Sequence, residues 1–427
     1  MEERSDMYRE ESRVTKNGIT VYDYKNPNIN SFYISLFLRA GSMFESQSGI
    51  THFLEHAAIR NVNHVMGGEL YAILDRYGIE FNASTFSEMV QFYISGATEN
   101  FSHAAEIIAR LLSPIDLPKS EILTERDRVK AEIREGDDKT SLSTFSNNIV
   151  YADTSLCLPI TGTLGEVSKI SAKSLESYRK SIMTSENIFF YVTGNYSESD
   201  LVKLSSELEK YCIHKGVKTE NIAPTSADFG NRKKHVYIKN ADFTMLRFSF
   251  DMDMSRMSVA ETDLIYDMLL CGYNSRFFIE MSEKRGLFYD ITGSSERYNN
   301  IGSFVFSFEV RGGSIYEATE AAIELLKQIK STEPREDEMM KAGYVTNARL
   351  LYDNPRELNF TLAYDNHIMN AGYTSVEGRA EKYRVITPHR ILTVASEIFR
   401  PENLTLAIKG NKKKIDVERL EEIVRKL

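Results

Sequence analysis

The stretch Gly49-Ile50-Thr51-His52-Phe53-Leu54-Glu55-His56 decides the fold and the chemistry that this chain is expected to have. Two histidines four residues apart project from one face of a helix, where both imidazoles can bind one metal ion. Apolar residues recur here at helical spacing, at Ile50, Phe53, Leu54, Ala57 and Ala58. The pattern predicts a helix with one buried side. Glu55 would lie beside the metal, free to move a proton.

The order H-x-x-E-H at residues 52–56 is the mirror of H-E-x-x-H and is typical of inverted zincins. Five residues also match by chance, so the alternative is two ordinary histidines on an amphipathic helix. A third ligand would distinguish a zinc site from a chance match, because catalytic zinc usually takes three protein ligands and leaves one position for water. In the inverted arrangement that ligand is a carboxylate from a distant second helix.

Residues 120–135, S-E-I-L-T-E-R-D-R-V-K-A-E-I-R-E, predict such a helix. Ser120 is a good N-cap, and Glu121 is favourable in the first turn. Glu125 and Glu132 are seven residues apart, about two turns, so they share a face. The alternative is a solvated helix face whose glutamates pair with neighbouring Arg and Lys side chains.

With these residues in place, the chain resembles the pitrilysin (M16) family of metallopeptidases, which includes insulin-degrading enzyme and the mitochondrial processing peptidases. The likeness runs over nearly the whole length. Besides the pentad, it rests on N-G-x-x-V at 17–21, A-G-S-x-x-E at 40–45, N-A-x-T at 82–85, P-I-x-G-T at 159–163 and a closing strand at 187–194. The family's third ligand is a Glu roughly 75 residues beyond the second His. Glu132 stands 76 residues beyond His56, and Glu125 fills the place of a supporting Glu seven residues earlier.

The resemblance therefore implies a Zn²⁺ site of His52, His56 and Glu132, with Glu55 as the general acid/base. Glu125 would orient a ligand histidine or the helix, and a plain salt-bridge role for it stays open.

The resemblance also implies where substrate binds. Asn82 and Ala83 lead into an edge strand on which a substrate peptide would pair through its main chain. The same segment could be an ordinary sheet edge, and both descriptions can hold together.

A departure from the family lies in the second half. The family uses an Arg and a Tyr, seven residues apart, to bind substrate and stabilise the oxyanion. Tyr289, after E-K-R-G-L-F, takes the place of that Tyr, but Ser282 stands where the Arg would be. One oxyanion donor can be worth about 10²–10³ in rate. The change predicts weaker catalysis or altered substrate choice, unless Arg285 or Arg276 substitutes. The alternative for Tyr289 is a core-packed aromatic at a strand end.

Composition narrows the class of protein. The chain has 427 residues with 42% hydrophobic and 26% charged residues, enough for two domains. A net charge of −9 argues against a nucleic-acid-binding protein. Three scattered cysteines, a charged start at residues 1–6 and no long apolar run favour a cytoplasmic protein without signal peptide or membrane span.

The segment at 214–233 reads as a linker, which places a zinc-binding domain at 1–220 and a second domain at 221–427. Strand-like segments at 31–38 and 243–250 each precede a helix, as after a duplication. The second helix has no histidine pair, so only the first domain should bind zinc. The expected fold is α+β: two homologous domains, each a mostly antiparallel sheet with helices on one face, like the LuxS and processing-peptidase metallohydrolases.

The sequence thus predicts a zinc-dependent metalloendopeptidase that cleaves peptides or unfolded segments inside a closed chamber. The resemblance implies that two-domain chains pair, as a homodimer or as a heterodimer with a related subunit. The alternative is a weakly active or non-catalytic subunit of a heteromeric peptidase. Substrate sequence and partner are not specified.

Overall fold

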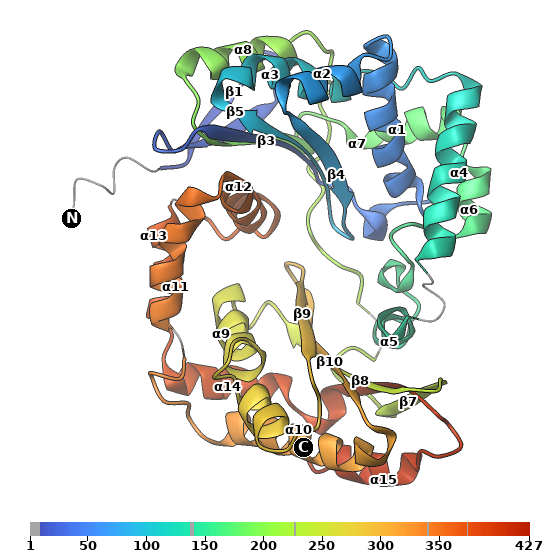
Figure 1. Cartoon of the computed structure of the whole chain (residues 1–427), viewed down its shortest axis with the longest axis vertical. Helices are drawn as coiled ribbons and strands as arrows, with labels where there is room; N and C mark the ends of the chain where they lie inside the picture. The colour runs from blue at the N-terminus through green and yellow to red at the C-terminus, as the bar shows by residue number, and fades with distance from the viewer. Residues whose placement is uncertain (1–8, 137–140, 226–227, 340, 374) are drawn as a thin grey trace. The chain divides into compact units, whose positions relative to one another are not determined.

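The computed structural model describes residues 9–136, 141–225, 228–339, 341–373 and 375–427 (Figure 1). The charged segment 1–6, and residues 226–227 of the expected linker, lie outside these. Two compact units result, one of Met1–Asp137, Leu158–Asn221 and Asn347–Arg379, the other of Asp138–Cys157, Ile222–Thr346 and Ala380–Leu427. The expected boundary after residue 220 falls beside the Asn221–Ile222 junction. The exchange of a segment between the two halves of the chain was not predicted.

Unit 1 is built on a sheet that has, in the described residues, the strand order β1-β2-β6-β3-β5-β4. Neighbouring strands are antiparallel except β2 and β6, which are parallel. The edge strand β4 forms an antiparallel hairpin with β5, which follows it in the chain. The strands are β1 (Glu11–Val14), β2 (Thr20–Lys25), β3 (Ser31–Leu38), β4 (Glu80–Thr85), β5 (Val90–Ala97) and β6 (Ile188–Gly194).

Both faces of this sheet are covered. Strand β3 reads S-F-Y-I-S-L-F-L and is buried along nearly its whole length, as a run without polar alternation requires. One face packs on the layer that includes α1, α3 and α8. The other packs on α12, which comes from the C-terminal half of the chain. The helices of this unit are α1 (Ile50–Val65), α2 (Leu70–Tyr77), α3 (Phe101–Ala109), α4 (Lys119–Glu135), α6 (Leu164–Lys169), α7 (Ala172–Ile182), α8 (Glu198–Leu208) and α12 (Pro355–Ala363).

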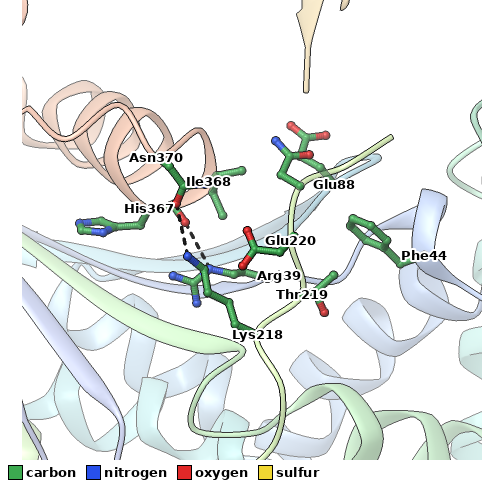
Figure 2. A pocket seen from close by; sticks show the side chains of 10 residues that line it. Arg39, Phe44, Glu88, Lys218, Thr219, Glu220, His367, Ile368 and Asn370 are labelled. Carbon is green, nitrogen blue, oxygen red and sulfur yellow. Dashed lines mark hydrogen bonds between the residues drawn. The ribbon is translucent and has the colours of Figure 1, made fainter. Parts of the chain in front are cut away.

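Buried polar contacts fix the exchanged segment 347–379 on the sheet. The Asn359 side chain accepts from Ser35 Oγ at 2.7 Å and donates to the Tyr191 carbonyl at 2.8 Å. Arg39 donates through Nε to the His367 carbonyl at 3.2 Å, as Figure 2 shows. Burial lowers the pKa of Arg39 to about 10. A buried polar group costs stability unless it is hydrogen-bonded, so these contacts favour a single position of the segment on the sheet.

Unit 2 repeats the topology of unit 1. Its sheet order in the described residues, β7-β11-β8-β10-β9, matches β2-β6-β3-β5-β4 strand for strand, including the single parallel pair. This confirms the α+β class with two domains of similar fold. The strands are β7 (Val236–Asn240), β8 (Thr244–Asp253), β9 (Ile291–Arg297), β10 (Ile301–Val310) and β11 (Leu404–Gly410).

Helices also cover both faces of the second sheet, so the expectation of helices on one face only was wrong for both units. Helix α9 (Val259–Leu270) corresponds to α1 and contains no histidine. It packs in the core with α10 (Ile315–Ser331), α14 (Pro388–Ile398) and α15 (Val417–Val424). Helix α5 (Leu142–Val150), from the N-terminal half, contacts β8 and β11, and Ser146 Oγ lies 3.2 Å from Ser249 Oγ. The chain changes units within α11 (Lys341–Ala348) and α13 (Val376–Arg384). Among all described helices, none is long and apolar enough to cross a bilayer.

Candidate metal centre

Two glycines and one carboxylate set the start of α1. Gly49 has φ +82° and Gly162 has φ +74°, and a Cβ on Gly162 would lie 2.5 Å from Gly49 Cα. Only glycine allows this approach of the two loops. Glu45 then accepts from the backbone N–H of Gly49 at 2.6 Å and of Thr51 at 3.1 Å. The carboxylate satisfies N–H groups that the first helical turn leaves free and favours the helix dipole. The motif containing Glu45 was recognised, but its capping role was not predicted.

Helix α4 brings the distant carboxylates to α1. It begins at Lys119 with Pro118 at the N-cap position, so the prediction of Ser120 as N-cap was wrong by two positions. Apolar side chains of both helices share one buried cluster, which includes Phe53 and Ala57 of α1 and Ile122 and Val129 of α4. The packing turns the face that carries Glu125 and Glu132 towards the histidine pair.

His52, His56 and Glu132 converge. His52 Nε2 lies 3.5 Å from Glu132 Oε1, and His56 Nε2 lies 3.4 Å from Glu132 Oε2. One ligand atom from each residue falls within 4.8 Å of the others. Burial, and secondarily His56, lowers the pKa of His52 to about 4, so this imidazole is neutral and its lone pair is free. Two imidazoles and a carboxylate are the donors that zinc takes in open catalytic sites, so these residues fit that ion.

Glu125 lies behind His56, on the side away from Glu132. Glu125 is buried, with 1% of the residue exposed. Its carboxylate lies 3.0 Å from His56 Nδ1 and accepts hydrogen bonds from Arg60 Nη1 at 3.0 Å and Arg128 Nη1 at 3.3 Å. Burial alone would raise the pKa of Glu125, but His56 and the arginines lower it overall. An ionised Glu125 can only accept, so it favours the His56 tautomer in which Nδ1–H donates to Glu125 and the unprotonated Nε2 faces Glu132. Arg60 was not predicted, although it lies one turn beyond His56 on the same helix face.

Glu55 is tied to the edge strand. The Thr85 hydroxyl, on the last residue of β4, donates to Glu55 Oε2 at 2.5 Å. Burial raises the pKa of Glu55, and the Thr85 hydrogen bond opposes this. Thr85 closes the N-A-x-T segment, but its contact with Glu55 was not predicted. Asn82 and Ala83 lie on the same strand, and the Asn82 side chain accepts from the Ala83 N–H.

Tyr289 and Ser282 belong to the second unit. The Tyr289 side chain is almost wholly exposed, at 98%, so the core-packed alternative was wrong. Ser282 Oγ donates to the Phe288 carbonyl at 3.2 Å. Of the two arginines considered as substitutes, Arg276 is paired with Glu338 and Arg285 is exposed. The role expected of Tyr289 stays a prediction.

The chain thus combines a duplicated α+β fold with a histidine pair and a remote carboxylate. Comparison with known families identifies the family. Residues 20–164 match the insulinase (peptidase family M16) domain, and residues 169–342 match the peptidase M16 inactive domain. The chain belongs to the M16 peptidase family.

Similar proteins carry names of the same kind. A Rickettsia bellii protein named as an uncharacterized zinc protease is 26% identical over 93% of this chain and 96% of its own length. The beta subunit of the rat mitochondrial-processing peptidase is 27% identical over 48% of this chain and 44% of its own. A Helicobacter pylori protease shares the fold, with a TM-score of 0.79 and 18% identity over 95% of this chain and all of that one.

Proposed function

We propose that this chain is a zinc-dependent endopeptidase whose ligands are His52, His56 and Glu132 and whose general acid/base is Glu55. The observation that carries the proposal is the convergence of two helices. The three ligand atoms lie within 4.8 Å of one another, and Glu55 is held next to them by the last residue of an edge strand. The fold alone would not support the activity, since one fold can serve many functions.

The chain's own groups account for the proton transfers. A bound zinc ion would supply Lewis acidity, which polarises the scissile carbonyl and acidifies the attacking water. The Glu55 carboxylate takes the proton from that water and hands it to the leaving nitrogen. Because Glu55 is buried and bonded to Thr85, its position is fixed before substrate arrives, and a fixed geometry lowers the cost of reaching the transition state.

The substrate would lie along β4. This strand has no neighbour on one side in the described sheet, so its main-chain groups can pair with an extended peptide. Main-chain pairing demands little of the peptide sequence. Asn82 and Ala83 would contact the peptide main chain, and Thr85 would mark the level of the cleaved bond.

Zinc content and cleavage of a quenched peptide test the proposal. For Glu55→Gln we expect about one zinc per chain, as in the parent, with cleavage lost, because Glu55 moves protons and does not bind the ion. Glu135→Gln, at an exposed position of α4, is the matched control and should retain both zinc and cleavage. Cleavage by Glu55→Gln at the parent rate would refute the role of Glu55. Absence of zinc from the parent after incubation with the ion would refute the site.

We also propose that the active form is paired, as a homodimer or a heterodimer around a closed chamber, in the cytoplasm. One relative is named as a subunit, and this chain covers only half of the periplasmic protease PqqL of Escherichia coli, with a TM-score of 0.79. All three cysteines are free, which suits a reducing compartment. Light scattering of the purified chain gives the mass directly, and a monomer that cleaves peptides would refute pairing.

The second candidate is a binding subunit of a heteromeric peptidase. Ser282 in place of the family Arg favours it. Under this candidate, the chain alone binds zinc but cleaves nothing until a related subunit is added. Tyr289→Phe tests the oxyanion role that the resemblance implies. If Tyr289 donates to the oxyanion, kcat falls by about 10²–10³ with zinc content unchanged.

A further inference from the structure

The two units differ at one edge of their sheets. In unit 2, β7 is the outermost strand, and within the described residues no strand pairs with its far side (Figure 1). The corresponding strand of unit 1 is β2, and there β1, a strand of four residues, pairs with it antiparallel. The same fold therefore carries an added strand at this edge of unit 1 and, in the described residues, none in unit 2.

Main-chain groups at the open edge of β7 point away from the sheet. The Ala241 N–H donates to the Gly410 carbonyl of β11 at 3.0 Å. In a parallel pair, only alternate residues of a strand bond to the neighbouring strand, so Ile238 and Val236 direct their N–H and C=O groups outward. The Val236 N–H donates to Glu421 Oε1 at 2.9 Å. Both backbone groups of Ile238 are without a partner among the described residues.

Lysines gather beside this edge. Residues 239–243, which lead from β7 into β8, and residues 409–416, at the end of β11 and beyond it, are joined by a hydrogen bond from the Lys412 N–H to Asn240 Oδ1 at 3.2 Å. The two segments carry five lysines against two aspartates, in a chain whose net charge is −9. Residues 412–414 are exposed. The lysines are Lys239, Lys409, Lys412, Lys413 and Lys414.

Neighbouring carboxylates do not neutralise this charge. The four lysines of residues 409–416 form no ion pair with any described residue. The Asp416 carboxylate accepts from the Arg419 N–H at the start of α15, and the Lys409 ammonium lies 5.0 Å from the centre of the Phe243 ring. The lysines are therefore available to an anionic group from another molecule. Their like charges also oppose pairing between this edge and the same edge of a second copy.

The register of the strands fixes what an added strand would meet. Lys239 pairs with Lys409, and Ile238 pairs with Ile408. Ile408 belongs to the core and Ile238 packs against it, so the two lysines lie on the opposite face of the sheet. Side chains of an added strand would alternate in the same way. Those beside Lys239 would face lysines, and those beside Ile238 would face apolar side chains.

We propose that the open edge of β7 is a docking surface for an extended segment of a partner protein, in which acidic residues alternate with apolar ones. The segment would take the place that β1 has on β2, with main-chain hydrogen bonds to β7 and carboxylates beside the lysines. A lipid surface or a nucleic acid would meet the lysines but leave the outward N–H and C=O groups of the strand unused. The proposal does not depend on the proposed peptidase activity, because every residue that carries it belongs to unit 2.

Anisotropy of fluorescently labelled peptides tests the docking surface. The Glu55→Gln variant is used so that no peptide is cleaved during a titration. A short peptide of alternating Val and Glu is compared with one of the same composition in which the Glu residues are adjacent. We expect the alternating peptide to bind about tenfold or more tightly. N-methylation of alternate peptide nitrogens should abolish binding for the set that faces β7 and spare it for the other set, because only the first set donates to the strand.

Charge reversal locates the bound peptide. Lys412→Glu/Lys414→Glu, made in the same variant, should weaken binding of the alternating peptide by about tenfold or more. Lys327→Glu/Lys382→Glu is the matched control, since it makes the same change of charge at two other exposed positions of unit 2. It should keep the parent affinity. Should Lys412→Glu/Lys414→Glu melt below the parent temperature, the two N-methylated peptides decide on the unaltered surface.

Several results would overturn the docking surface. Equal affinity for the two peptides, or an equal effect of both N-methylation patterns, contradicts strand addition. Binding that survives Lys412→Glu/Lys414→Glu places the peptide elsewhere on the chain. Binding of phosphatidylserine vesicles or of a single-stranded oligonucleotide through these lysines, with no binding of either peptide, would show another class of partner. None of these results changes the zinc content or the cleavage expected of the parent, so the proposed function is judged separately.

Discussion

The contact between Glu125 and His56 makes the strongest quantitative prediction. The Glu125 carboxylate is buried, lies 3.0 Å from His56 Nδ1 and accepts a hydrogen bond from Arg60 at 3.0 Å. In Glu125→Gln, one carboxylate oxygen becomes an NH₂ group that cannot accept, so one of these charge-assisted contacts is lost. Loss of a group that orients a metal-binding histidine typically costs about 10–100-fold in metal affinity. We expect Glu125→Gln to weaken zinc binding by that factor, or about 1.4–2.8 kcal/mol.

Competition with a chromogenic chelator at constant pH measures the zinc Kd of each variant. Glu121→Gln, one helical turn earlier, is the matched control, since Glu121 pairs with Arg60 and His64 but with none of the ligands. It should bind zinc nearly as the parent does. Melting of the zinc-free proteins shows whether either substitution disturbs the fold itself. Equal zinc affinity in Glu125→Gln and the parent would refute the orienting role and leave Glu125 as an ordinary ion-pair residue.

Three further predictions concern activity, stability and pH. Thr85→Val should lower kcat about tenfold with zinc content unchanged, because Glu55 loses the donor that positions it; an unaltered kcat would show that this contact is dispensable. Asn359→Leu should destabilise the chain by about 2–3 kcal/mol in urea unfolding, since it leaves buried partners unsatisfied; a change near zero would contradict this. Burial raises the pKa of Glu176, but hydrogen bonds from Arg179 and a backbone N–H lower it overall. The Glu176–Arg179 pair is partly exposed and stabilises the fold by about 1 kcal/mol. This contribution is present above the pKa that Glu176 has in the unfolded chain. It is lost as pH falls through the lower pKa that Glu176 has in the folded chain. Glu176→Gln should therefore be less stable than the parent at neutral pH and equally stable in acid, and a constant difference would refute the argument.

Much of the fold followed from local patterns. The apolar run at 31–38 is β3, and the periodic stripe from Ile50 to Ala58 lies on the buried side of α1. The duplication was visible as a repeated order of strand and helix, and the matching sheet topologies confirm it. These patterns are readable because side-chain periodicity reports which face of an element is buried.

The exchanged segments were not readable in this way. Helices α5 and α12 look like ordinary amphipathic segments of their own halves, and each covers the sheet of the other half's unit. The uninterrupted burial of β3 was the available signal, since an antiparallel strand with one solvated face would alternate. An apolar run without alternation indicates that both faces of the sheet are covered at β3, but it does not indicate which segment covers each face.

The sequence by itself predicted which residues make up the candidate centre: two imidazoles on one helix face, the Glu55 carboxylate between them, and, through the family resemblance, Glu132 as their partner. Tertiary structure decided what surrounds these groups. The hydrogen bond from Thr85 to Glu55 and the Arg60 contact behind Glu125 join residues that local spacing does not relate. Helical spacing fixes neighbours one turn apart, whereas contacts between distant segments depend on how whole helices and sheets pack.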